Sequence, residues 1–413
     1  MAVQPQRRDQ EITRRGHAPV RPGRRVHASN VVPMWPQSKP KIDLGLRAEL
    51  SVLGVRAAPP LRRRAAGGAG RPSDDGQWTL DGTPITLPIA ADSPWARASD
   101  GTLTRAGVKV DIDLGEIARP RFYDRTTADG TRYDQLARLH GTDVLVATTP
   151  AGTLPGHLAE VARAAVELDG VRQLVLTSAT STGRDRGARH LARCVAAVRV
   201  VLPSLPIQVQ TGPPVDLVWI RRLYGAGATA IAIHAESLDD DVRRRCTPGK
   251  PVVPMARYEE AWAESVLIFG RNRVCTYLLI GRGEDPDELV AGARRLIAMG
   301  VYPFVVPYRP LEGGLAHAVG VPAPSHEIVA DVTDRVGRAL RNAGMRGADQ
   351  AAGCAACGAC SPLSAVGGDT RCRSAAPRHR TPPPTNARQT PRGVTCVRRV
   401  LRVRSPCRPV GGM

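Results

Sequence analysis

Six short apolar runs alternate with segments of helical spacing between residues 144 and 340, and this alternation constrains the fold most strongly. The runs lie at Val144–Ala147, Gln173–Thr177, Ile207–Gln210, Ala230–His234, Val274–Ile280 and Pro303–Val306. Strands that alternate with helices predict an α/β fold with a parallel sheet and right-handed crossovers. The runs are continuously apolar, so we expect both faces of the sheet to be covered. Six units fall short of a closed eight-fold barrel, which leaves an open doubly wound sheet or a partial (βα)6 TIM-like barrel.

The net charge of +20 is concentrated at the two ends of the chain. Residues 1–72 hold 15 basic and four acidic residues, and residues 369–413 hold 11 basic residues and one acid. Both ends are rich in Pro and Gly and poor in large apolar residues, which predicts a disordered basic tail (1–72) and a disordered Arg/Pro-rich tail (369–413). Such tails can bind phosphate backbones non-specifically, but composition alone explains them, and we do not expect nucleic acid as a partner.

The remaining chain divides into three parts. Residues 73–142 form a lead-in with β-hairpins, indicated by Asp-Gly pairs at 81–82 and 100–101, and a short helix is expected over Asp134–His140. Residues 143–345 hold the partial βα barrel, and residues 346–368 form a Cys-rich segment with a predicted metal site.

Several sequence features indicate a cytoplasmic protein. No stretch approaches the apolar length of a membrane span, so no membrane association is expected, and the amino terminus lacks the apolar centre of a secretory signal. The cysteine count is nine, an odd number. Without an export signal this favours thiol or metal chemistry in a reducing compartment over disulfides.

Polar residues follow five of the six predicted strands, and the carboxyl ends of parallel strands form the ligand-binding edge in either architecture. These segments are 177–183, 210–212, 234–237, 281–285 and 307–310. Glycines at such turns let a backbone approach a ligand, and the following helix start offers N–H groups to anions. The sequence therefore predicts one polar rim that binds a small molecule.

Structural roles compete with binding roles for several of these residues. Glu284–Asp285 suits the first turn of a helix that begins at Pro286, and Glu236 suits an N-cap position. His234 is expected to be a packed imidazole at a strand end. Arg243–Arg245 could clamp a carboxylate, but three consecutive side chains cannot all face the same way on a helix.

The sequence motif Cys-x-x-Cys-x-x-Cys is formed by Cys354, Cys357 and Cys360. Gaps of two small residues place three sulfurs around one volume, as in ferredoxin-like loops. An iron–sulfur cluster is the favoured occupant. Zinc would need a fourth ligand, such as Cys372 or a distant histidine, and three thiols that bind nothing are the remaining alternative. Cys194 and Cys275 fall on apolar faces and are expected to be core thiols.

Over residues 75–368 the chain resembles the radical S-adenosylmethionine (SAM) superfamily, and within it a biotin-synthase-like subgroup of bacterial proteins encoded near nitrilases. The runs that carry the resemblance are Arg119–Asp124, Thr126–Gly130, Leu139–Gly141, Asp185–Cys194, Glu236–Asp240, Gly283–Pro286 and Gly353–Cys360. The resemblance implies a partial barrel of the radical SAM type with a [4Fe–4S] cluster and SAM as cofactors. It also implies reductive cleavage of SAM, radical chemistry on a small-molecule substrate, and an electron donor such as flavodoxin or ferredoxin.

The same resemblance implies roles for five rim residues. Gly281, Gly283 and Glu284 would lie near the adenine of SAM. Glu236 would lie near its ribose or methionine moiety, and Arg245 would pair with its carboxylate.

The chain departs from the family pattern after the first barrel strand, where three cluster-binding cysteines are expected. Thr149–Pro155 contains no cysteine, and no cysteine precedes Cys194. A second departure is Thr211-Gly212 in place of a Cys-Glu pair. The sequence thus leaves two hypotheses: a radical SAM-type enzyme, either intact or a truncated or defective copy, and a non-catalytic barrel that binds a small molecule or a partner protein.

Overall fold

The computed structural model describes residues 42–57, 75–150, 152–178, 183–247, 249, 252–310 and 318–366. The tail at 369–413 and most of the tail at 1–72 lie outside these residues, so their predicted disorder stays a prediction. No helix among the described residues is both long enough and apolar enough to span a membrane.

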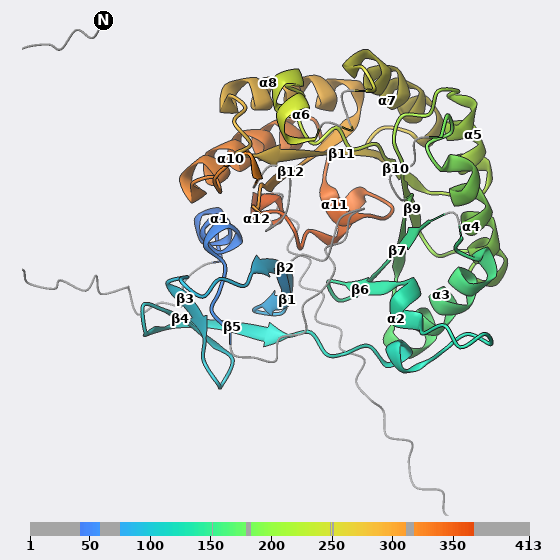
Figure 1. Cartoon of the computed structure of the whole chain (residues 1–413). Coiled ribbons are helices and arrows are strands. Elements are labelled where there is room, and N and C mark those ends of the chain that lie inside the picture. Colours follow the sequence, from blue (N-terminus) through green and yellow to red (C-terminus); the bar gives the residue numbers. More distant parts are fainter. Residues whose placement is uncertain are drawn as a thin grey trace, which may run out of the picture. The chain divides into compact units, whose positions relative to one another are not determined.

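Seven strands form one curled sheet in the order β12-β11-β10-β9-β8-β7-β6 (Figure 1). The strands are β6 (Arg138–His140), β7 (Val144–Thr149), β8 (Gln173–Ser178), β9 (Ile207–Gln210), β10 (Ala230–Ala232), β11 (Val274–Ile280) and β12 (Val301–Pro307). β7 to β12 run parallel, whereas β6 pairs antiparallel with β7. The strand order follows the chain without reversal, which is typical of a barrel wall and not of a doubly wound sheet. The partial barrel is therefore the better of the two predicted architectures.

Six helices follow the parallel strands and lie on the convex side of the sheet (Figure 1). They are α3 (Pro155–Asp169), α4 (Ala188–Val201), α5 (Val218–Gly225), α7 (Met255–Phe269), α8 (Pro286–Met299) and α10 (His326–Asn342). Each contains one of the segments of helical spacing, so all six predicted helices are confirmed. Their ends follow local chemistry, because Gly170 and Gly300 end α3 and α8 in the left-handed conformation while Asp285 and Ser325 cap α8 and α10. A seventh helix, α6 (Asp240–Cys246), was not predicted from apolar spacing.

The two faces of the sheet differ in polarity. Strand pairing aligns Val175 with Gln208 and Thr177 with Gln210, which gives these four side chains a common face. Gln210 donates to Gln208 at 3.1 Å on that face. Both faces of the sheet were expected to be covered: the six helices cover the convex face, and the carboxy-terminal part of the chain covers the concave face.

The carboxy-terminal segment 346–366, here called the cysteine segment, covers the concave face (Figure 1). It contains the short helices η2 (Gly347–Asp349), α11 (Cys354–Cys357) and α12 (Leu363–Val366). Gln208 donates to the carbonyl of Ala352 at 3.1 Å, and the backbone N–H of Gly353 donates to Gln173 Oε1 at 2.8 Å. The polar concave residues therefore hold this segment through its backbone.

The lead-in forms a separate antiparallel sheet in the order β2-β1-β5-β4-β3. Its strands are β1 (Asp75–Leu80), β2 (Thr83–Pro88), β3 (Trp95–Arg97), β4 (Thr102–Arg105) and β5 (Val108–Glu116). The turn between β1 and β2 has positive φ at both Asp81 and Gly82, which confirms the predicted hairpin. β2 contacts the cysteine segment, because the N–H of Thr86 donates to the carbonyl of Ala359 at 2.9 Å.

Two expectations for this region were wrong. Residues 44–53, assigned to the basic tail, form helix α1 (Leu44–Leu53), whose Leu50 joins Trp78 and Trp95 in a buried core. The average over 72 residues concealed this short apolar stretch. Asp134–His140 was expected to be a helix, but α2 (Tyr133–Leu136) is followed by strand β6, because β7 offers an open edge to pair with.

Candidate functional site

The rim residues Glu236 and Arg282 form an ion pair where β10 and β11 end. Glu236 has a positive φ of 69°, and its backbone N–H donates to the carbonyl of Tyr277 at 2.9 Å. Its Oε2 atom lies 3.3 Å from Nη1 of Arg282, a side chain that is 3 % exposed. Glu236 therefore does not cap the next helix; Asp239 caps α6 instead. A non-glycine residue at positive φ is rare and indicates a constrained position.

The turn after β11 is held by Glu284. Its carboxylate accepts from the backbone N–H groups of Gly281 and Arg282, the latter at 2.8 Å. Gly281 and Gly283 have φ of 95° and 99°, which favours glycine at both positions. Asp285, and not Glu284, caps α8. The helix-start role thus belongs to Asp285, while Glu284 closes the turn in which both glycines lie.

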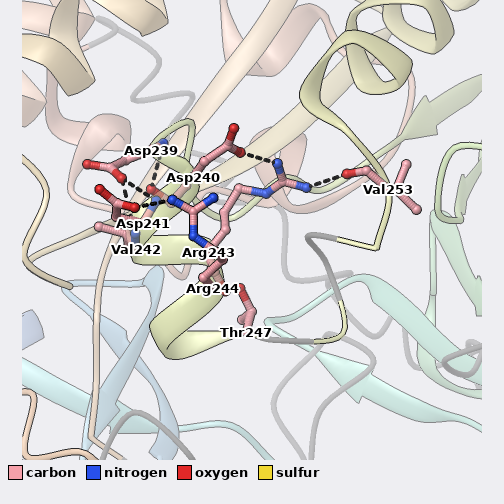
Figure 2. Close-up of polar contacts among 9 residues, drawn as sticks. Asp239, Asp240, Asp241, Val242, Arg243, Arg244, Thr247 and Val253 are labelled. Carbon is pink, nitrogen blue, oxygen red and sulfur yellow. Dashed lines mark hydrogen bonds and ion pairs between the residues drawn. The ribbon is translucent and has the colours of Figure 1, made fainter.

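The three consecutive arginines of α6 have three different environments, and Figure 2 shows those of Arg243 and Arg244. Arg243 is fully buried and bonds Asp240 at 2.7 Å and the carbonyl of Val253 at 2.9 Å, so it anchors α6 to the following turn. Arg244 is exposed and pairs with Asp241. Arg245 alone reaches the rim, where its Nη2 donates to the carbonyl of Arg282 at 2.9 Å.

All five rim residues implied by the family resemblance therefore lie in one region, linked through Arg282. Glu236 pairs with Arg282, Arg245 and Glu284 bond its backbone, and Gly281 and Gly283 flank it. Arg282 itself was not predicted as a site residue. Its position between two glycines directly after a strand was the available signal, because such a turn brings the intervening side chain to the rim.

A cavity of about 250 Å³ opens beside the rim, between the loop before α6, β11 and α8. Its acidic lining residues are Glu236, Asp239, Asp240, Glu284 and Glu288, with Arg295 as a basic residue. Leu278 and Leu289 contribute its apolar wall. Leu278 and Tyr277 are neighbours in β11, so their side chains point to opposite faces of the sheet. The ring of Tyr277 faces the cysteine segment. Leu278 and the cavity therefore lie on the face that the helices cover.

The three cysteines of the predicted metal site lie on the concave side of the sheet. Burial raises the pKa of Cys354 well above its ordinary value, and the charges of Cys360 and Cys357 raise it further. Burial raises the pKa of Tyr277 as well, and the thiols of Cys354 and Cys360 raise it further. Cys360 Sγ lies 3.3 Å from His140 Nε2, and the Cys357 sulfur lies 3.0 Å from where a Cβ on Gly141 would stand. The sulfurs of Cys357 and Cys360 thus lie beside Gly141 and His140 at the end of β6, and Cys354 hydrogen-bonds with Tyr277.

A buried cation lies near the same sulfurs. Arg47 of α1 is 3 % exposed, and its guanidinium donates to the carbonyl of Pro84 at 3.3 Å. Burial lowers the pKa of Arg47 to about 10, while the charge of Cys357 raises it. Within the described part of the chain no carboxylate pairs with Arg47, and its Nε has no hydrogen-bond partner. A buried cation without an anion is costly, so this site is suited to a negative occupant.

The donor set fits an iron–sulfur cluster better than a single metal ion. In the described chain no three His, Cys, Asp or Glu side chains converge closely enough to hold one ion. All six cysteines described are free thiols; in the cysteine segment Cys357 and Cys360 lie together at the end of β6, and the buried Arg47 interacts electrostatically with Cys357. Thiolate-bound clusters are anionic and extend over several atoms, whereas zinc draws four donors onto one centre.

Cys360 lies away from the position of the expected cluster loop. His140, which contacts Cys360, pairs with Val144 at the start of β7. The missing loop would follow Thr149, five residues later, which is about 16 Å along the strand. Residues 149–155 offer no thiolate there, so they do not fit the cluster that would bind SAM.

Cys194 and Cys275 are both buried, as expected for core thiols, and burial raises the pKa of Cys194 to about 11. Their surroundings differ. Cys194 packs within α4, whereas Cys275 lies near Cys354. His234 is half-buried and stacks on Tyr277 at 4.2 Å between ring centroids, which confirms its packing role.

Comparison with known proteins gives partial matches to two curated enzymes. The chain is 26 % identical over 137 residues to a bacteriochlorophyllide c C-7(1)-hydroxylase of Chlorobaculum limnaeum, covering 33 % of this chain and 34 % of that protein. It is 30 % identical over 160 residues to a lipoyl synthase of Marinobacter nauticus, covering 37 % and 43 %. The matched part thus spans less than half the length of either relative. Both relatives are radical SAM enzymes, which supports the superfamily resemblance but not the subgroup.

No known protein-family model matches the chain. Among solved structures, a chitinase domain from Pyrococcus furiosus aligns with a TM-score of 0.27 and 15 % identity over 38 % of this chain and 56 % of that chain. A dihydropteroate synthase from Xanthomonas albilineans aligns with a TM-score of 0.25 and 15 % identity over 64 % and 93 %. Alignments this weak carry no argument about the fold or the function.

Proposed function

We propose that this chain is a barrel protein of the radical SAM type that binds SAM at the rim and an iron–sulfur cluster at Cys354, Cys357 and Cys360. The observation that carries the proposal is the convergence of Glu236, Arg245 and the Gly281–Glu284 turn on Arg282. The partial matches to two radical SAM enzymes support the same assignment.

The rim residues would recognise the charged groups of SAM. Arg282 and Arg245 place two guanidinium groups near the ends of β10 and β11, where a carboxylate can pair with them. The acidic side chains of Glu236 and Glu284 suit the positive charges of the ammonium and sulfonium groups. The turn at Gly281 and Gly283 lets the backbone approach a planar base.

The cysteine segment would hold its cluster on the concave side of the sheet. Arg47 supplies the positive charge that an anionic cluster requires, and the polar concave face keeps the segment in the barrel. A cluster of this kind supplies one-electron chemistry when bound, and a flavodoxin or ferredoxin is the proposed electron donor.

The lack of cysteines after β7 favours the non-catalytic alternative for the chain as it stands. The loop there offers no thiolate for the cluster that performs reductive SAM cleavage in the superfamily. The proposed activity is therefore binding of SAM or a related small molecule.

The test combines SAM titration by calorimetry with anaerobic reconstitution of the full chain. We expect saturable SAM binding that Glu236→Gln weakens at least tenfold and that the matched control Arg244→Ala leaves unchanged. We also expect iron and sulfide in equal amounts, and their loss in the Cys354→Ser/Cys357→Ser/Cys360→Ser variant.

Two further outcomes decide the remaining points. Wild-type protein that does not bind SAM contradicts the rim assignment. Formation of 5′-deoxyadenosine under dithionite contradicts the non-catalytic reading and restores the enzyme hypothesis.

A further inference from the structure

The histidine at the end of β6 lies between the cysteine segment and the lead-in sheet. His140 is 2 % exposed. Its Nε2 atom lies 3.3 Å from Cys360 Sγ, and its Nδ1 atom lies 2.8 Å from Nε2 of Gln77 in β1. Both ring nitrogens therefore have polar neighbours, and the position of the ring proton decides what His140 can do.

The orientation of Gln77 is fixed by the backbone. Its Oε1 atom accepts from the N–H of Gly141 at 2.8 Å. A backbone N–H can only donate, so the amide oxygen must face Gly141 and the amide nitrogen must face His140. The amide nitrogen in turn can only donate. Nδ1 of His140 must then be an acceptor, and the neutral ring carries its proton on Nε2, directed at the sulfur of Cys360.

We infer that His140 donates a hydrogen bond to Cys360 and that Gln77 fixes it in this role. We further infer that this bond tunes the reduction potential of the iron–sulfur site in the cysteine segment. The tuning role rests on the proposed function of that segment. A protonated Nε2 has no lone pair for a metal, so His140 is not the fourth ligand that a zinc site would need. It is a positioning residue that acts through the sulfur.

The physical effect follows from charge. An N–H directed at a ligating thiolate withdraws electron density from it and stabilises the more negative, reduced state of the cluster. Hydrogen bonds to the sulfurs are among the factors that set the reduction potentials of iron–sulfur clusters. His140 should therefore make the cluster easier to reduce. Thr86, whose hydroxyl lies 3.6 Å from Cys360 Sγ, is the other polar neighbour contributed by the lead-in.

The first test needs no cluster. Long-range ¹H–¹⁵N correlation on the full chain without metal reports which imidazole nitrogen of His140 carries the proton. We expect the Nε2–H tautomer in the wild type and the Nδ1–H tautomer in Gln77→Glu, because a carboxylate oxygen accepts where the amide nitrogen donated. The Nδ1–H tautomer in the wild type would overturn the donor assignment.

The second test measures the midpoint potential of the reconstituted cluster. We expect a more negative potential in His140→Leu and in Gln77→Glu, with iron content retained in both. His140→Gln should restore most of the wild-type potential, because its amide nitrogen reaches near the position of the ring Nε2. Arg138→Gln, an exposed change on the same strand, is the control. Equal potentials in all variants would overturn the tuning role.

The outcomes separate the two proposals. A wild-type chain that binds no iron contradicts the proposed function and the tuning role together, while the donor assignment is still decided by the tautomer. Bound iron with the wrong tautomer contradicts the inference alone.

Discussion

The rim and the cysteine segment balance their charges differently. At the rim, Glu236 pairs with the buried Arg282, and Glu284 is satisfied by two backbone N–H groups. Near the cysteines, Arg47 is buried and has no carboxylate partner among the described residues. A site whose charges pair internally can be stable without its ligand. A buried cation with no anion indicates that the ligand supplies the missing charge.

The attachment of the cysteine segment gives the largest expected effect. A Cβ on Gly353 would lie 2.1 Å from Nε2 of Gln208, and its φ of 114° disfavours any other residue. We expect Gly353→Ala to lower the free energy of unfolding by about 4 kcal/mol and to abolish iron binding, because strain and overlap act together. Denaturant unfolding and iron analysis measure both effects.

The matched control is Gly156→Ala in α3, where a Cβ would meet no atom within 4 Å. It should stabilise the chain by about 0.5 kcal/mol. A Gly353→Ala variant as stable as this control would show that the cysteine segment does not lie against Gln208.

The rim depends on a second buried arginine. Arg243 joins α6 to the carbonyl of Val253, as Figure 2 shows, and Arg243→Met leaves that carbonyl and Asp240 without their donor. We expect a loss of about 3 kcal/mol in stability and weaker SAM binding, with iron content unchanged. Calorimetry measures stability and SAM binding, and iron analysis of the same preparation measures iron content.

Arg244→Ala serves as its control, since an exposed ion pair contributes about 0.5 kcal/mol at most. Loss of iron in the Arg243→Met variant would contradict the independence of the two sites.

The repeating part of the fold could be predicted from the sequence, because a strand and its covering helix each carry a local apolar pattern. The helices over α3 and α8 followed from spacing and from terminal glycines. The covering of the concave face could not be predicted. It depends on Gln173 and Gln208 bonding a backbone far away in the sequence, and glutamines in an apolar run give no sign of such a partner.

The candidate site shows the same division. Glu236 and the Gly281–Glu284 turn were predicted because they directly follow strands. Arg47 was assigned to a basic tail, because regional composition concealed an amphipathic turn of helix that buries it. His140 was placed in an expected helix, and only the pairing of β6 with β7 brings it to Cys360.

The charge contrast between the rim and the cysteine segment predicts that loss of Arg47 stabilises the metal-free chain, whereas loss of Arg243 destabilises the chain. Arg47→Met removes a buried cation that has no carboxylate partner among the described residues, so the metal-free chain should gain about 2 kcal/mol in stability. The same change should reduce iron retention, because the counter-charge of the cluster is lost. Thermal unfolding without metal and iron analysis after reconstitution measure the two effects separately. A destabilised metal-free chain would mean that Arg47 has a favourable partner, and the contrast between rim and cysteine segment would fail.

The smallest effect uses Cys194 as a reference thiol that belongs to neither site. Burial raises its pKa to about 11, above the value of a thiol in an unfolded chain. The folded state then holds a proton that the unfolded state loses, so the contribution to stability is complete below about pH 8.5 and falls as the pH rises toward 11. By pH 9.5 the wild type should lose about 1 kcal/mol more than Cys194→Val, as measured by denaturant midpoints at pH 7.5 and pH 9.5. Parallel slopes for the two proteins would show that packing inside α4 does not desolvate this thiol, and the buried thiols of the cysteine segment would then need a cause other than burial for their raised pKa values.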